Sequence, residues 1–126
     1  PLPQIVREQA LRRRAEAAIP LQKYDVAVAD LQVLLKDKPD DQALQLRLGM
    51  AQVGRKDTAA ALAIFDRMLA VRPSGGAFYG RGVAHFTAGD RTAALAELDR
   101  AIAMEPGNQA YRNVRAQIAG QPTAPK

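Results

Sequence analysis

The stretch GGAFYGRGVAHFTAGDRTAALAELDRAIAMEP, residues 75–106, predicts two helices joined by a tight turn. Two runs free of proline, residues 77–88 and 91–104, flank the dipeptide Gly89-Asp90, which favours a turn. Pro106 then ends the second run, because proline has no backbone N–H and its ring obstructs a continuing helix. This stretch therefore predicts a helical hairpin.

The same pattern recurs along the chain with a step of about 34 residues. The prolines that close successive units, Pro39, Pro73 and Pro106, keep this step. Three further series keep it too: Ala15, Gly49 and Gly82; Ala27, Ala61 and Ala94; Leu31, Phe65 and Leu98. Such a period is the signature of stacked repeats, in which each unit buries its apolar face against its neighbour.

The repeat sets the expected fold class and domain organisation. We expect an all-α superhelix, or solenoid, in which three helix pairs and a C-terminal capping helix form one domain over residues 1–119. The three pairs and the cap are expected over residues 8–41, 42–74, 75–107 and 108–119. Residues 120–126 contain two prolines and are expected to form a disordered tail.

The second unit shows where its helices should begin and end. Residues 42–53 form the first expected helix and residues 58–71 the second, with Asp57 as a suitable N-cap between them. In the third unit we expect Gly75-Gly76 to lie in the turn before the first helix.

Composition limits the chemistry that the chain can perform. Its 126 residues suit one domain, and aromatic residues make up only 5%, so the core must consist mostly of Ala, Leu, Val and Ile. The absence of cysteine excludes disulfides, thiolate metal sites and cysteine nucleophiles. The formal charge of +5 favours acidic partners. No apolar run approaches the roughly 18 residues that a membrane span needs.

The repeating unit resembles the tetratricopeptide repeat. In the third unit Phe78 occupies the family's large aromatic position and Gly82 its small helix-contact position. The second helix of that unit matches through Ala94, Leu98, Ala101 and the closing Pro106. The second unit matches through Leu48, Gly49, Ala61, Phe65 and Pro73, with Met68 in place of the usual second alanine. The degenerate first unit keeps Ala15, Tyr24, Ala27, Leu31 and Pro39.

The resemblance covers about residues 8–119 and implies a function as well as a fold. It implies a scaffold that binds another protein or a peptide on the concave surface of the superhelix, which the first helices of the units line. It is specific for the fold and unspecific for the partner.

No constellation of residues predicts catalysis, and we expect a non-catalytic protein with no cofactor and no metal. His85 is the only histidine, and without clustered carboxylates it is better explained as a packing residue than as a ligand. Asp40-Asp41 precede a helix, where carboxylates favour the N-terminus. Gly75-Gly76 lacks the lysine and the preceding strand that a phosphate-binding loop requires.

Two apolar triplets predict where a partner lies if the resemblance holds. Each triplet has the spacing i, i+4, i+7 on a first helix: Leu46, Met50 and Val53, then Tyr79, Val83 and Phe86. Three arginines are expected at the rim of this surface: Arg12, Arg47 and Arg112. Such a groove suits an amphipathic or extended segment with acidic flanks. The alternative is that the triplets pack between neighbouring first helices.

Other binding modes are less favoured or stay open. The family's clamp for a C-terminal carboxylate is not expected, because Glu16, Gly76 and Gly80 occupy three of its positions and only Arg12 suits a fourth. Self-association through the apolar surface or an open repeat end stays open. Nucleic-acid binding is disfavoured, because the basic residues are not interleaved with aromatic ones.

Overall fold

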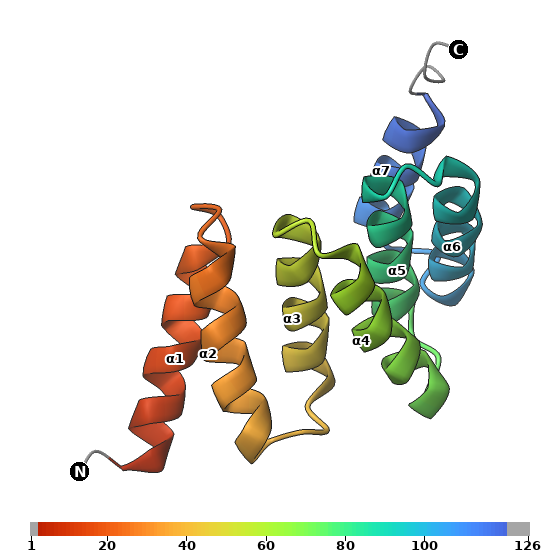
Figure 1. The fold of residues 1–126 in the computed structure, drawn as a ribbon. Coiled ribbons are helices and arrows are strands. Elements are labelled where there is room, and N and C mark those ends of the chain that lie inside the picture. Colours follow the sequence, from red (N-terminus) through yellow and green to blue (C-terminus); the bar gives the residue numbers. More distant parts are fainter. Residues whose placement is uncertain (1–2, 121–126) are drawn as a thin grey trace.

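The fold is an array of α-helices stacked in consecutive pairs (Figure 1). The computed structural model describes residues 3–120, which form seven helices and no strand. The helices are α1 (Gln4–Ala18), α2 (Tyr24–Asp37), α3 (Gln42–Gly54), α4 (Thr58–Val71), α5 (Gly75–Thr87), α6 (Arg91–Met104) and α7 (Gln109–Ala119). The pairs α1–α2, α3–α4 and α5–α6 follow one another and α7 completes the array, which confirms the expected all-α solenoid.

The structure differs from the sequence expectation at the start of α5. The expected turn at Gly75-Gly76 is wrong, because α5 already begins at Gly75 and Ser74 is its N-cap. The two glycines lie in close contact with side chains of other helices and loops instead: a Cβ at Gly76 would lie 3.1 Å from Leu46 Cδ2, and one at Gly75 would meet the Glu105 side chain. Of the expected disordered tail, residues 121–126 lie outside the described residues, and Gly120 is the C-cap of α7.

Side-chain caps determine where most helices begin. Five N-cap side chains accept a hydrogen bond from a backbone N–H in the first turn: Asp41, Asp57, Ser74, Asp90 and Asn108. Each bond satisfies one of the free donors at a helix start and typically contributes about 1 kcal/mol. The capping expected at Asp41 and Asp57 is thus confirmed.

Phe65 on α4 is the centre of the contact between the second and third units. Its side chain is fully buried, among the largest to be so. A Cβ added at Gly49 on α3 would lie 2.5 Å from Phe65 Cε1, and a Cβ at Gly80 on α5 would meet the same ring. The ring therefore fills the space that two glycines leave on two neighbouring helices.

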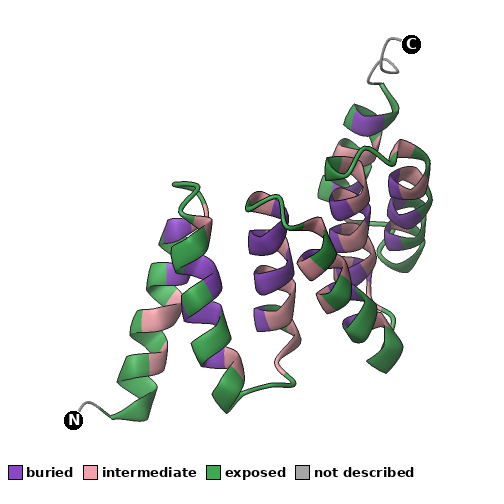
Figure 2. Ribbon diagram, viewed as in Figure 1, coloured by how far each residue is buried: buried purple, intermediate pink, exposed green. Residues whose placement is uncertain are grey.

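The C-terminal helix covers the last unit, as expected. Ile118 on α7 is 3% exposed and packs with Ala94 and Leu98 of α6. Val114 and Tyr111 lie on the same face of α7, half-buried and buried respectively. Figure 2 shows the buried residues between the helices and the exposed ones on the outer faces. The cap thus removes from water an apolar surface that no further repeat covers.

We expect Gly80→Ala to lower the free energy of unfolding by at least about 1 kcal/mol, because overpacking outweighs the gain in helix propensity. Urea denaturation measures the effect. Gly107→Ala is the control, since a Cβ at Gly107 has no neighbour within 4 Å. Adding Phe65→Leu to Gly80→Ala should restore part of the loss through coupling of the two positions. Equal stabilities of the Gly80→Ala and Gly107→Ala variants would disprove the contact.

We expect Ile118→Ala to destabilise the domain by about 2–5 kcal/mol, because it opens a cavity where α7 meets α6. The neighbouring exposed residue offers the matched control, and Gln117→Ala should change stability by no more than about 0.5 kcal/mol. Thermal melting of the two variants compares them. An Ile118→Ala protein as stable as the control would show that α7 does not act as a cap.

Candidate functional site

The first helices lie on the inner side of the array. α3 packs directly against α5, whereas the second helices α2, α4 and α6 make no comparable contact with one another within residues 3–120. This contact, with no comparable one between second helices, places α3 and α5 on the inner side of the array. The candidate site therefore lies over α3, α5 and α7.

The first apolar triplet packs against the contact between α3 and α5. Leu46, Met50 and Val83 are half-buried beside the cluster that contains Phe65. Val53 is only 8% exposed and belongs to that cluster, so it supports the surface and does not form part of an open floor. The expectation of accessible floor residues thus needs correction at Val53, because the close packing of α3 on its neighbours leaves this side chain no solvent.

The second apolar triplet extends the contact to α7. Tyr79 and Phe86 on α5 are half-buried beside the cluster that contains Ile118. The rings of Tyr79 and Tyr111 stack with centroids 5.0 Å apart and an interplanar angle of 23°. Both alternatives left open by the sequence therefore contribute: these side chains pack between neighbouring first helices and still keep part of their surface in solvent.

Tyr111 closes the C-terminal end of this surface. Its hydroxyl donates a hydrogen bond to Glu105 Oε2 at 2.7 Å. Burial raises the pKa of Tyr111 to about 12, with further contributions from the hydrogen bond and the charge of Glu105. Burial also raises the pKa of Tyr79. The phenol groups are therefore neutral donors over the physiological pH range.

The three rim arginines are engaged with other parts of the chain. Arg12 pairs with Asp41 at 3.4 Å and Arg47 pairs with Glu16 at 2.8 Å, so two ion pairs connect the first unit to the start of the second and to α3. Arg112 donates two hydrogen bonds to the backbone oxygen of Pro106. The structure thus places Arg12 and Arg47 close to one another in the array and Arg112 at its other end.

Asp41 is held in its charged form. The Leu44 backbone N–H donates to its carboxylate at 3.1 Å. That bond, and to a smaller extent Arg12, keeps the pKa of Asp41 below its usual range. A carboxylate that is both N-cap and ion-pair partner fixes the start of α3 relative to α1.

The sequence predicts no metal site among the described residues. Residues 3–120 contain no group of three or more His, Cys, Asp or Glu side chains placed to hold a metal ion. His85 is half-buried on α5. Among the described helices, none has the length and apolar character to traverse a bilayer.

Sequence reasoning missed a repeated arginine on the first helices. Arg14 donates to Asp30 at 2.7 and 2.6 Å, and Arg81 donates to Glu97 at 2.7 Å, each pair joining the two helices of one unit. Arg115, one repeat step after Arg81, instead pairs with Asp99 on the preceding helix and so joins the capping helix α7 to α6. The signal was present in the repeat, since Arg81 stands two repeat steps after Arg14.

Comparison with known proteins agrees with this architecture. The model of the family described as tetratricopeptide repeat matches residues 12–78 and 79–120. No curated protein matches the sequence. Among solved structures, the NMR structure of the first TPR domain of the human RPAP3 protein is similar, with a TM-score of 0.77 and 21% identity over 89% of each chain. At that identity the likeness shows the fold alone.

We expect the contribution of Tyr111 to stability to vanish at alkaline pH. Its folded-state pKa of about 12 lies above the value of about 10 for an unfolded tyrosine. The contribution is therefore complete below pH of about 10 and is lost as the pH rises through about 12. Ultraviolet titration should show one phenol ionising near the upper value, and Tyr111→Phe should remove that phase.

Glu105→Gln tests the cause of the raised pKa. An uncharged acceptor no longer repels the phenolate, so the pKa of Tyr111 should fall while burial keeps it above the ordinary value. An unchanged titration in this variant would show that Glu105 has no part in the shift.

Proposed function

Because the chain belongs to the tetratricopeptide repeat family, we propose that it binds an amphipathic or extended protein segment over α3, α5 and α7. Domains of this family generally act as protein-protein interaction scaffolds and are generally non-catalytic. The proposal is that this chain does the same through its own inner surface.

One observation carries the proposal: five apolar side chains on two successive inner helices keep part of their surface in solvent. They are Leu46, Met50, Tyr79, Val83 and Phe86. On a surface helix, the residues outside the core-facing stripe are usually polar, and a group of exposed apolar side chains there often marks a binding surface. Since their inner faces are already anchored in the core, these side chains are held rigidly and lose little freedom on binding.

The charges around this surface support a partner that carries acidic residues beside its apolar segment. Arg47 and Glu16 form an ion pair in which both side chains are largely in solvent, at 40% and 52% exposed. Exposed pairs of this kind contribute only about 0–1 kcal/mol. A carboxylate of the partner can therefore replace Glu16 at Arg47 at small cost, and the net charge of +5 favours its approach.

We expect Met50→Glu to leave the domain folded and to weaken partner capture by about tenfold or more. Met50 is half-buried, so the polar side chain can reach solvent, but a carboxylate then replaces an apolar contact. Ala103→Glu is the matched control, because it makes the same charge change at an exposed position on α6. Circular dichroism and thermal melting establish folding, and quantitative pull-down measures capture.

A photo-crosslinking residue at position 50 or 103 gives the second readout. Partners should be captured from position 50 and not from position 103. A folded Met50→Glu protein that retains every wild-type partner, or equal crosslinking from both positions, would refute the assignment.

Self-association is a second candidate, supported by the open first unit. Ile5 and Val6 on α1 are 64% and 42% exposed, and no described helix covers them. A second copy placed against this end would bury them. Light scattering at several concentrations tests it: a constant mass excludes self-association, and a rising mass that Ile5→Ser abolishes supports it.

A further inference from the structure

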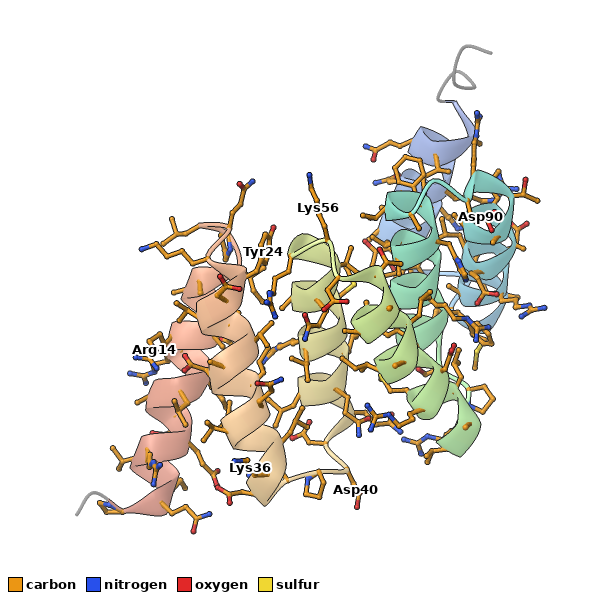
Figure 3. All side chains as sticks on the ribbon, viewed as in Figure 1. Arg14, Tyr24, Lys36, Asp40, Lys56 and Asp90 are labelled. Carbon is orange, nitrogen blue, oxygen red and sulfur yellow. The ribbon has the colours of Figure 1, made fainter. Side chains whose placement is uncertain are left out.

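A second groove lies on the other side of the array, between α2 and α4 and over α3. Its volume is about 340 Å³. It is lined by Gln32, Leu35, Lys36, Pro39, Gln45, Leu48, Ile64 and Arg67. Lys36, labelled in Figure 3, projects from the C-terminal end of α2. The site proposed above uses α3, α5 and α7, so this groove does not depend on that proposal.

The lining is apolar at the floor and basic at the edge. Leu48 and Ile64 come from α3 and α4, and Leu35 from α2. No acidic residue lines the groove. Lys36 and Arg67 are exposed, and neither has a carboxylate within 4.0 Å among the described residues.

The corresponding place one repeat later is filled by the chain itself. Gln45, Leu48, Ile64 and Arg67 are followed, one repeat step on, by Phe78, Arg81, Glu97 and Arg100. There the Phe78 ring lies under two guanidinium groups, with Arg81 Cζ 5.7 Å and Arg100 Cζ 5.8 Å from its centroid. Contact of an aromatic ring with guanidinium groups at such distances is stabilising.

Carboxylates complete the filled place. Arg81 pairs with Glu97 at 2.7 Å and with Asp66 at 3.0 Å, and Arg100 pairs with Glu97 at 3.3 Å. Asp66 stands one repeat step after Gln32, which lines the open groove. The filled place therefore contains one aromatic ring and two carboxylates, and the open groove contains none of the three.

Arg67 is the member of this set that the open groove keeps. Its equivalent, Arg100, has both a carboxylate and a ring as partners. Arg67 instead lies beside Ile64 and Leu48, which replace Glu97 and Arg81 in the repeat. The groove thus keeps the arginine of the third unit's arrangement, as Arg67, but has no aromatic ring and no carboxylate to pair with it.

We propose that this groove binds a segment of another protein that supplies an aromatic side chain and a neighbouring carboxylate. The ring lies on Leu48 and Ile64 beneath Arg67, as Phe78 lies beneath Arg100. The carboxylate pairs with Arg67 or Lys36. The partner then provides in trans what the third unit provides in its own sequence.

A second copy of this chain does not suit the groove. All six aromatic residues are buried or half-buried in the domain: Tyr24, Phe65, Phe78, Tyr79, Phe86 and Tyr111. None can leave its place without loss of packing. Residues 1–126 of a second copy therefore do not supply the ring, and we assign the occupant to a segment of another protein.

The test uses a short fluorescent peptide with one Phe flanked by Asp and Glu in a Gly/Ser chain, capped at both ends. Fluorescence anisotropy measures its affinity for the whole chain. Replacing Phe by Ala should weaken binding by about thirtyfold, and replacing the acidic residues by Lys should abolish it. NMR shifts of the Leu48 and Ile64 methyl groups should map the probe to the groove.

Two variants of the protein test the assignment. Arg67→Glu should weaken binding by about tenfold, whereas Arg13→Glu, which makes the same charge change at an exposed residue of α1, should change it by less than about twofold. The triple variant Gln45→Phe, Leu48→Arg and Ile64→Glu copies the ring and one of the two carboxylates of the third unit into the groove, together with the arginine that they contact. It should lose the probe, and circular dichroism checks its folding first, because Leu48 is only 9% exposed and belongs to the buried cluster between α2 and α3.

Three results would overturn the proposal. They are equal binding of the Phe and Ala peptides, equal effects of Arg67→Glu and Arg13→Glu, and methyl shifts confined to α5 and α7. If the triple variant fails to fold, Arg67→Glu against Arg13→Glu decides, since both positions are exposed. Loss of probe binding in Met50→Glu but not in Arg67→Glu would assign the peptide to the inner surface instead.

Discussion

The structure depends on one packing contact, the insertion of the Phe65 ring between α3 and α5. The ring is fully enclosed, and it can be so only because Gly49 and Gly80 present no side chain to it. Dense packing of a rigid ring fixes both the distance and the angle between two units. The position of this ring therefore determines which faces of α3 and α5 are exposed to solvent.

Close approach of the inner helices explains why the candidate binding surface is only partly open. Where α3 meets α5, the same apolar side chains hold the units together and face the groove. The first unit also packs on the second through one buried apolar cluster, to which Leu31 and Leu34 of α2 and Leu44 of α3 belong. Ion pairs from Arg12 and Arg47 add a second link between α1 and the second unit. Both junctions of the array therefore rest on interlocked apolar side chains.

The outer side of the array shows how one repeat can diverge from the others without loss of fold. Arg14 and Arg81 each pair with an acidic residue on the second helix of the same unit, while the second unit has Leu48 and Ile64 at these places. Both the charged pair and the apolar pair allow the two helices of a unit to pack together. A groove lies beside the apolar pair, where no long side chain with bound partners covers the floor.

The sequence by itself determined the class of the fold, the number of helix pairs and the capping helix. These features show in local signals: the regular repeat step, a closing proline in each unit, and caps such as Asp57. Local signals can be recognised in the sequence without knowing which surfaces pack together. The tertiary structure decided what the glycines do and how far each apolar residue is exposed. Gly75 begins a helix whose N-cap is Ser74 and lies against the Glu105 side chain, and Val53 is buried while Met50 is half-buried, although both belong to the same helical triplet. Periodicity specifies the face of a helix that a residue occupies, whereas the neighbouring helix, brought close by contacts distant in sequence, determines how much of that face water can reach.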